Sequence, residues 1–482
     1  MTKPLCVAII GGGIAGLVAA YTLRQQVQTN TQQAIHITLL EAGERLGGKI
    51  QTVQFADMPV DTGAEGMLLQ DAGQQLLQRL GLSLEVLESK TVRTNIWTRG
   101  RLRPLPDGMV MGVPTDPFSI MRSGIVSPLG MLRAGMDIFL PRTQFSADPT
   151  IHEVLGARLG TEMVAYLVEP LLGTIHAGKV DRLSLAAVAP SLAEMARKHR
   201  SLILGLRPHV FKKRREQTKK RNLLQLYSFA DGLNRLVQRL HECLEGVDIH
   251  LESRLRMLER DSDGIYHLTC SEGTALDAES VILAVPAWEA SRLLQHLDAA
   301  SAQELGAIEH ASVMVTLLSY RSSALAQTCF PGTGFLVPRA DGHLMNACTW
   351  VTRKWPRQNH LDRIVLRCSA GRAGDERAVQ MSDNELLETI HHELSEALGI
   401  QERPVETLVT RWERSFPQYH TGHHARVARV ETMLAERLPG IVLAGGAYHG
   451  VGLASCMKDG IQAAERIQAY LGHSQLSCLR GS

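Results

Sequence analysis

The strongest constraint on the fold of this chain is a run of glycines close to its start. Residues 11–16 satisfy the spacing G-x-G-x-x-G. The apolar run Leu5–Ile10 before them is rich in Val and Ile, which is typical of a buried parallel strand. Helical spacing follows over Ile14–Arg24, and a second apolar run occupies Ile35–Leu40. We therefore expect a strand, a glycine turn, a helix and a second strand in this part of the chain.

A glycine turn in this position can hold the phosphates of a dinucleotide. The first glycine permits the tight turn, the second lets a pyrophosphate approach the backbone, and the third lets the helix pack on the strand. The free N–H groups and the positive helix end then attract the anion. A carboxylate that ends the second strand accepts ribose hydroxyls. The contacts predicted here are Gly11, Gly12, Gly13, Ile14, Ala15, Gly16 and Glu41.

The same pattern returns at the C-terminal end of the chain. Gly440–Gly446 is predicted to be a strand that ends in glycines. Gly450, Val451, Gly452 and Leu453 then open a last helix. A second helix N-terminus directed at a cofactor would stabilise negative charge on it, although a purely structural cap and turn is the alternative. Between the two ends, 151–205 is helix-rich, and strand-like runs recur from 248 onward.

The composition is that of an ordinary folded protein, with 44% hydrophobic and 21% charged residues. The 51 Lys and Arg nearly balance the 49 Asp and Glu, so no global field favours nucleic acid. The basic run Lys212–Arg221 contains no aromatic residue and is interpreted as a solvated loop. Met121–Leu140 carries too many charges for a membrane span. The eight cysteines are scattered, which favours reduced thiols and a cytoplasmic location.

Two further segments resemble the flavin amine oxidase superfamily. Glu41–Lys49 fits its signature E-A-x-x-R-x-G-G-[KR], and Asp61–Gly66 fits the D-x-G segment that follows. The resemblance implies FAD as the cofactor. It also implies a discontinuous Rossmann-type FAD-binding domain (1–95, 222–289 and 406–482), a helical insertion (96–221) and a substrate-binding sheet domain (290–405), an α/β and α+β fold. The additional FAD contacts that it implies are Ala42, Arg45, Lys49, Gly63, Ala64, Glu65, Gly66, Leu255 and Trp412.

Longer stretches resemble the porphyrinogen oxidases of the heme pathway. They are Leu105–Thr115, Glu169–Gly178, Lys198–Leu202, Ala347–Trp350 with Lys354–Pro356, and Arg411–Trp412 with Pro417–His423. The most similar pattern is the oxygen-dependent, soluble Gram-positive branch. It implies oxidation of the tetrapyrrole coproporphyrinogen III to coproporphyrin III by O2, with protoporphyrinogen IX as a second substrate. A contact with the downstream heme-pathway enzyme is left open.

Two alternatives remain at this point. One is an amine oxidase or a carotenoid desaturase on the same fold, and the other is a flavin-binding regulator without activity. Hydride removal by a flavin needs no dedicated acid–base pair, so we nominate no catalytic residue. We expect no metal site, because the adjacent His423 and His424 would point to opposite sides of an extended chain. Candidate cations for substrate carboxylates are Lys179, Arg182, Lys198, Arg200, Arg339, Arg353 and Lys354.

Overall fold

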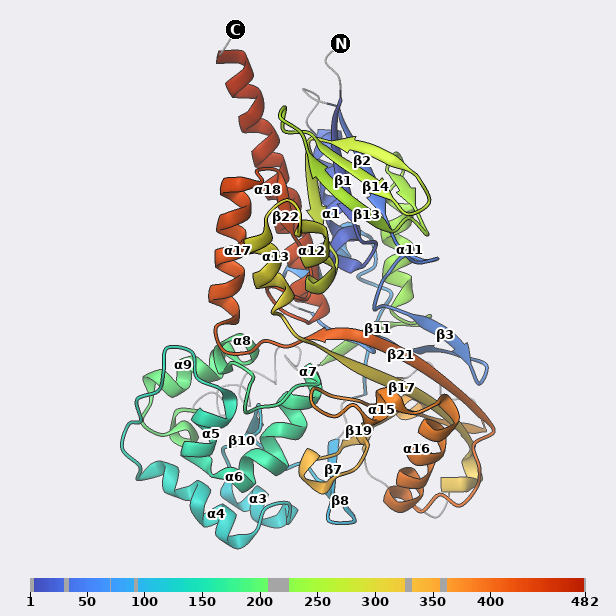
Figure 1. Cartoon of the computed structure of the whole chain (residues 1–482). Coiled ribbons are helices and arrows are strands. Elements are labelled where there is room, and N and C mark those ends of the chain that lie inside the picture. The colour runs from blue at the N-terminus through green and yellow to red at the C-terminus, as the bar shows by residue number, and fades with distance from the viewer. Residues whose placement is uncertain are drawn as a thin grey trace.

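The computed structural model describes residues 4–29, 34–69, 71–90, 94–206, 225–325, 332–355 and 362–480. The basic run 212–221 and Pro356 lie outside these residues. Figure 1 shows a nucleotide-binding part at the top with both chain ends, a helical lobe at the lower left, and a long-stranded sheet at the lower right.

The nucleotide-binding part is built on a five-stranded sheet in which all neighbouring strands are parallel. The strand order is β12-β2-β1-β16-β22. Helices cover one face and a three-stranded sheet with further helices covers the other, each over its own apolar core. This confirms the expected fold class. The strands are β1 (Leu5–Ile10), β2 (Ile35–Leu40), β12 (Asp248–His250), β16 (Ser280–Leu283) and β22 (Ile441–Leu443).

The layers on this sheet come from distant parts of the chain. The helices of one face are α1 (Ile14–Thr29), α2 (Asp71–Arg79), α11 (Asn234–Glu242) and α18 (Leu453–Arg480). The other face carries β13 (Leu255–Arg260), β14 (Tyr266–Cys270), β15 (Ala275–Ala278), α12 (Ala287–Leu294), α13 (Ala299–Gly306) and α17 (His423–Arg437). A small sheet of β5 (Met67–Leu68), β6 (Val86–Glu88) and β11 (Leu226–Phe229) lies beside them.

The second large sheet has seven strands in the order β21-β17-β20-β19-β18-β7-β8. They are β7 (Thr94–Thr98), β8 (Arg101–Pro104), β17 (His310–Arg321), β18 (Gly334–Leu336), β19 (Met345–Trp350), β20 (Arg363–Ala370) and β21 (Glu406–Pro417). Helix α16 (Asp383–Leu398) covers one face, and the hairpin of β3 (Thr52–Phe55) and β4 (Met58–Asp61) packs on the other. Short elements at its margins are η3 (Ser322–Leu325), η4 (Arg339–Asp341), α14 (Val351–Lys354) and α15 (Arg377–Gln380).

Two of the expected domain boundaries do not agree with the strands that make up this sheet. Strands β7 and β8 precede the helical lobe but pair with the second sheet, and β21 after residue 405 does the same. Divisions at 95/96 and 405/406 therefore separate strands from the sheet to which they belong. The rest of the division stays a prediction.

The helical lobe is a layer of short helices around its own core. Helix α5 begins with the capping box of Thr150 and Glu153. Ten residues form a π-helix, η2, around Pro170, whose missing N–H cannot join an α-helical ladder. The elements are β9 (Met109–Val110), β10 (Val113–Pro114), α3 (Pro117–Ser123), α4 (Pro128–Gly135), η1 (Met136–Ile138), α5 (Ile151–Leu159), α6 (Thr161–Met163), η2 (Val164–Gly173), α7 (Thr174–His176), α8 (Leu185–Val188) and α9 (Pro190–Lys198). None of the helices in the described ranges has both the length and the hydropathy that crossing a membrane requires.

Candidate functional site

The glycine turn after β1 is held in place by Glu41 at the end of β2. One carboxylate oxygen accepts the backbone N–H of Gly12 at 2.7 Å, and the other accepts that of Gly43 at 2.7 Å. The loop after Glu41 then returns to the turn, where the N–H of Gly47 donates to the carbonyl of Gly12 at 2.8 Å. Glu41 thus fixes the two loops between which a dinucleotide would lie.

The space around this turn fits a pyrophosphate. A Cβ at Gly16 would lie 2.0 Å from the carbonyl oxygen of Gly11, so helix α1 can approach the turn only because no side chain is there. A Cβ at Gly13, by contrast, would meet no atom within 4 Å. The backbone is therefore uncovered on this side of Gly13, and the first N–H groups of a helix have no partner within it, as anion binding requires.

The two cations of the loop after β2 occupy different environments. The guanidinium of Arg45 donates to the carbonyls of Gly48 at 2.8 Å and Ile50 at 2.9 Å, and so shapes its own loop. The ammonium of Lys49 donates to the carbonyl of Ser415. Burial lowers the pKa of Lys49, although its residue keeps accessible surface. Protein atoms thus crowd the ammonium of Lys49, while the residue stays reachable from solvent.

The second glycine segment fastens the nucleotide-binding part to the seven-stranded sheet. A Cβ at Gly63 would lie 2.0 Å from the carbonyl oxygen of Lys49, so only glycine fits where these two segments approach each other. The indole of Trp412 on β21 donates to the carbonyl of Thr62 at 2.9 Å. The guanidinium of Arg367 on β20 donates to the carbonyl of Gly63 at 2.7 Å.

Glu65 forms a partly buried ion pair in the same segment. Its carboxylate lies 2.9 Å from the ammonium of Lys354 and 3.9 Å from the guanidinium of Arg367. Burial alone would raise the pKa of Glu65, but the charges of Lys354 and Arg367 lower it below its ordinary value. Lys354, one of the candidate cations for substrate, is therefore used to neutralise Glu65.

The C-terminal glycine loop closes the site from the third side. Asp459 on α18 accepts the N–H of Gly445 at 2.7 Å and the Nδ1–H of His449 at 2.8 Å. His449 is also 3.6 Å from Glu431, which pairs with Arg466. These contacts hold the loop that leads through 450–452 into α18.

The predicted contacts therefore lie on adjoining elements. The segment before Leu255 lies along Glu41, because the N–H of Ser253 donates to the carbonyl of Glu41 at 2.8 Å. Leu255 itself is buried. Contact of each residue with FAD stays a prediction. The set that these elements bring together is Gly11, Gly12, Gly13, Ile14, Ala15, Gly16, Glu41, Ala42, Arg45, Lys49, Gly63, Ala64, Glu65, Gly66, Leu255, Trp412, Gly450, Val451, Gly452 and Leu453.

His449 gives this site a pH dependence. Hydrogen bonds to Asp459 and to Glu431 raise its pKa to about 9, against about 6.5 in an unfolded chain. Because the folded state binds the proton of His449 more tightly, protonation of His449 stabilises the folded state. This stabilisation is complete below pH 6.5 and is lost as the pH rises through 9. We expect the FAD-loaded protein to unfold at lower temperature at pH 9.5 than at pH 6.5. In the His449→Gln variant, the difference in unfolding temperature between the two pH values should become smaller. An unchanged difference would show that His449 does not cause the pH dependence.

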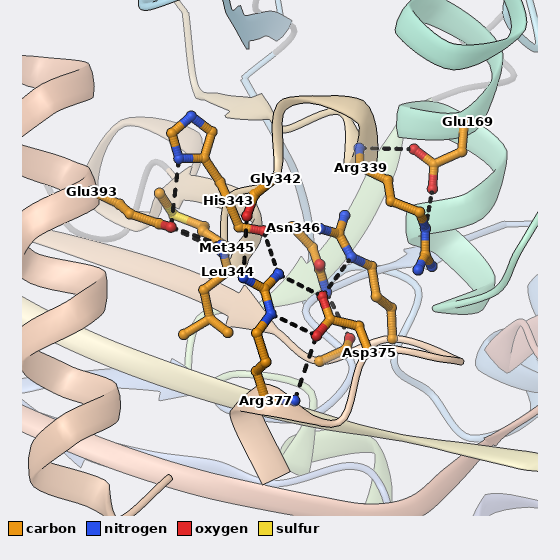
Figure 2. A network of polar contacts seen from close by, with 12 residues as sticks. Glu169, Arg339, Gly342, His343, Leu344, Met345, Asn346, Asp375, Arg377 and Glu393 are labelled. Atoms are coloured by element: carbon orange, nitrogen blue, oxygen red, sulfur yellow. Dashed lines mark hydrogen bonds and ion pairs between the residues drawn. The ribbon is translucent and has the colours of Figure 1, made fainter. Parts of the chain in front are cut away.

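Figure 2 shows how the helical lobe is attached to the seven-stranded sheet. Glu169 on the π-helix accepts the Nε–H and the backbone N–H of Arg339, both at 3.3 Å. In the same network, Asp375 binds Arg377 at 2.7 Å. Glu393 accepts the N–H of Leu344 at 2.7 Å. Arg339 thus links the helical lobe to the seven-stranded sheet.

Most of the other candidate cations are also engaged within the chain. Arg182 pairs with Glu309, Lys198 with Glu194, and Arg200 donates to the carbonyl of Ile138. Arg353 lies over the ring of Trp350. Lys179 differs, because its ammonium group makes no hydrogen bond or ion pair with the residues that the structure describes and lies beside Gly374.

The expected geometry of His423 and His424 is wrong. These residues begin helix α17 rather than an extended strand, and their ring centroids are 5.8 Å apart. His423 stacks on Tyr419 and bonds the carbonyl of Tyr448 at 3.0 Å. Within the described ranges, no three His, Cys, Asp or Glu side chains gather as metal ligands would.

Comparison with known proteins assigns the family. Residues 14–468 match the family described as flavin containing amine oxidoreductase. The chain belongs to this family. The flavin amine oxidase resemblance is thereby confirmed, and the cofactor of the chain is FAD.

Individual relatives in this family narrow the comparison. The chain is 34% identical over 466 residues to a coproporphyrinogen III oxidase of Bacillus subtilis, covering 96% of this chain and 98% of that protein. It is 29% identical to a protoporphyrinogen oxidase of Bos taurus, over 96% and 98% of the two chains. A crystal structure from Exiguobacterium sp. 255-15, provisionally named a protoporphyrinogen oxidase, superposes with a TM-score of 0.85 at 30% identity, over 97% of this chain and all of that one. A cyclohexylamine oxidase of Brevibacterium oxydans shares the fold, with a TM-score of 0.68 at 18% identity and 98% and 100% coverage.

Proposed function

We propose that this chain oxidises coproporphyrinogen III to coproporphyrin III with O2 as the electron acceptor. The observation that carries the proposal is the end-to-end likeness to proteins named coproporphyrinogen III oxidase, at 34% identity for that of Bacillus subtilis and 30% for that of Staphylococcus aureus. The long porphyrinogen oxidase stretches in the sequence are consistent with it, since they lie in both the helical lobe and the second sheet.

The reaction removes six electrons from the tetrapyrrole in three two-electron steps. Bound FAD would supply the hydride acceptor for each step, and three O2 would take up the six electrons to give three H2O2. The chain has to orient the substrate, exclude water and hold the cofactor. We assign the holding of FAD to the residues on the three converging glycine elements, with Glu41 at the adenosine end and Lys49 at the point where the elements meet.

Recognition of the substrate should depend on its carboxylates. Coproporphyrinogen III carries four propionates, and protoporphyrinogen IX carries two propionates and two vinyl groups. A buried carboxylate without a partner is costly, so a pocket for the former needs cations or open water at its rim. Lys179 is the candidate that the structure supports best, because the other cations are engaged within the chain. Protoporphyrinogen should still react, since replacing carboxylates by vinyl groups adds little bulk.

Adding coproporphyrinogen III to the FAD-loaded protein in air tests the activity. We expect a Soret band to grow faster than in the protein-free control, with three H2O2 formed per porphyrin. For coproporphyrinogen, kcat/KM should exceed that for protoporphyrinogen by roughly tenfold, about 1.4 kcal/mol of transition-state binding. Preference for protoporphyrinogen would overturn the substrate assignment but not the oxidase chemistry. Oxidation of simple amines instead would favour the amine oxidase alternative.

We further propose that the chain works in the cytoplasm. The cysteines that the structure describes are all free, which supports a reducing compartment. Contact with the enzyme that consumes the porphyrin product is part of the same proposal. Co-purification with that enzyme and fractionation of cells would test both statements.

A further inference from the structure

The helical lobe contains a pocket beside the C-terminal end of α9 (Figure 1). All of its lining residues belong to the lobe, and none lies on the glycine elements to which we assign the holding of FAD. The space between them is about 210 Å3 with the open mouth included, and its enclosed part admits about one water-sized group. The polar side chains of the lining are Arg142, Thr143, Arg158, His199 and Arg200.

Two of the three arginines carry charge that the lobe does not neutralise. The Nε atom of Arg158 lies 2.6 Å from the carboxylate of Asp137, so this charge is balanced. Arg142 and Arg200 are exposed, and among the residues that the structure describes neither guanidinium is within ion-pair distance of a carboxylate. The described lining itself contains no acidic side chain. The pocket therefore holds two uncompensated positive charges.

Backbone carbonyls hold both of these guanidiniums in place. Arg142 donates from Nη2 to the carbonyl of Arg197 in the last turn of α9, and so covers part of the negative end of that helix. Arg200 donates from Nη2 to the carbonyl of Ile138 at 3.0 Å. Because a guanidinium carries five N–H donors, one backbone bond leaves most of them available. Both side chains are thus positioned and still have donors for a ligand.

A hydroxyl and an imidazole add further donors to the pocket. The hydroxyl oxygen of Thr143 accepts from Nη1 of Arg158 at 3.5 Å, so its hydrogen can be donated elsewhere. The ring of His199 packs on Gly205, where a Cβ would lie 2.8 Å from the ring atom Cγ. Its nitrogens make no hydrogen bond with the described residues, and an imidazole donates through at least one of them. Donors therefore come from both chain segments that border the pocket.

We propose that this pocket binds the phosphate group of a phosphate monoester. A planar carboxylate pairs best with one guanidinium fork, whereas a tetrahedral phosphate offers terminal oxygens to donors from several directions. One oxygen would enter the enclosed part, and the ester would remain at the open mouth. The charge of a monoester at pH 7, about −1.5 to −2, matches the two unpaired guanidiniums. The proposal assigns Arg200 to a site separate from that of the porphyrinogen.

Substitutions at the two free arginines test the site directly. The FAD-loaded full chain is titrated with glycerol phosphate at constant ionic strength, and the phosphorus NMR signal of the ligand is the readout. Arg142→Gln and Arg200→Gln each remove one charge and keep an amide that can donate to the backbone carbonyl. Arg197→Gln is the matched control, because it removes one charge from the same end of α9 but does not line the pocket. Thr143→Val removes the hydroxyl without changing the charge.

We expect Arg142→Gln and Arg200→Gln each to weaken binding roughly tenfold and Thr143→Val about threefold. Arg197→Gln should stay within about twofold of the parent chain, and acetate should bind at least about tenfold more weakly than glycerol phosphate. If either glutamine variant melts well below the parent, Thr143→Val decides the outcome.

Equal losses in Arg142→Gln and Arg197→Gln would show unspecific attraction to a basic surface and would overturn the proposal. Absence of saturable binding by the parent chain would overturn it too, unless the chain binds vesicles of phosphatidylcholine with phosphatidic acid, which present the same group on a lipid. In that case Arg142→Gln and Arg200→Gln must release the vesicles while Arg197→Gln retains them, and any other result would exclude the lipid source as well.

Discussion

Replacing Glu41 by alanine is expected to weaken FAD binding by roughly two to four orders of magnitude. The carboxylate accepts the N–H groups of Gly12 and Gly43, and its remaining lone pairs are the proposed acceptors for the ribose hydroxyls. Bonds to a charged group contribute about 1.5–3 kcal/mol each, so losing two of them costs about 3–6 kcal/mol. The variant should therefore purify without the yellow colour of the parent chain.

Two measurements check this expectation. The dissociation constant of FAD is obtained by titrating apoprotein, and the flavin released on denaturation is quantified in the purified protein. Glu41→Gln is the matched control, because it preserves the size of the side chain and one acceptor oxygen. It should bind FAD more weakly than the parent and more tightly than the alanine variant. Retention of stoichiometric FAD by Glu41→Ala would show that the cradle does not depend on this residue.

Replacing Asp137 by alanine should destabilise the helical lobe by about 3–5 kcal/mol. Asp137 is fully buried and lies 2.6 Å from the Nε atom of Arg158, which is also buried. Its second oxygen accepts the hydroxyl of Ser201 at 2.7 Å and the N–H of Ile203 at 3.0 Å. Removing the carboxylate leaves a buried guanidinium without its counter-charge and two buried donors without an acceptor.

Hydrogen exchange measured by mass spectrometry reports the stability of the helical lobe separately from that of the rest of the chain. Exchange over 117–206 should accelerate in Asp137→Ala, while β1 and β16 keep their protection. The double variant Asp137→Leu with Arg158→Leu should recover most of the protection, because an apolar pair of similar volume replaces the charges. If the double variant is less stable than the single one, the ion pair itself stabilises the lobe and the argument from the unpaired charge fails.

The elements that local patterns define could be predicted from the sequence. The βαβ unit at the start and the strand and helix at the C-terminal end follow from spacing within a few residues of each other. The glycine turns can also be recognised in the sequence, because the close backbone approaches at Gly16 and Gly63 leave no room for a side chain. Motif spacing was thus enough to nominate the residues that are proposed to hold the cofactor.

Contacts between distant segments could not be predicted. Lys354 and Arg339 were nominated as cations for substrate, but Glu65 and Glu169, each more than 150 residues away, hold them. The assignment of β21 to the second sheet depends on pairing with β17, about 90 residues earlier. A burial pattern could place such residues inside the protein, but it could not name their partners.

The order of the strands in the parallel sheet has a consequence for how the protein is made. The ribosome delivers β1 and β2 first, but the neighbouring strand β16 and the edge strand β22 follow about 240 and 400 residues later. The glycine loop and α18, which close the cradle, come last. During synthesis one edge of the central strand β1 therefore stays unpaired until β16 has been made. An unpaired strand edge promotes aggregation, and pairing between distant segments is slow. We therefore expect FAD to be loaded only after synthesis is complete, and chains that end before Ile441 to lack part of the cofactor site.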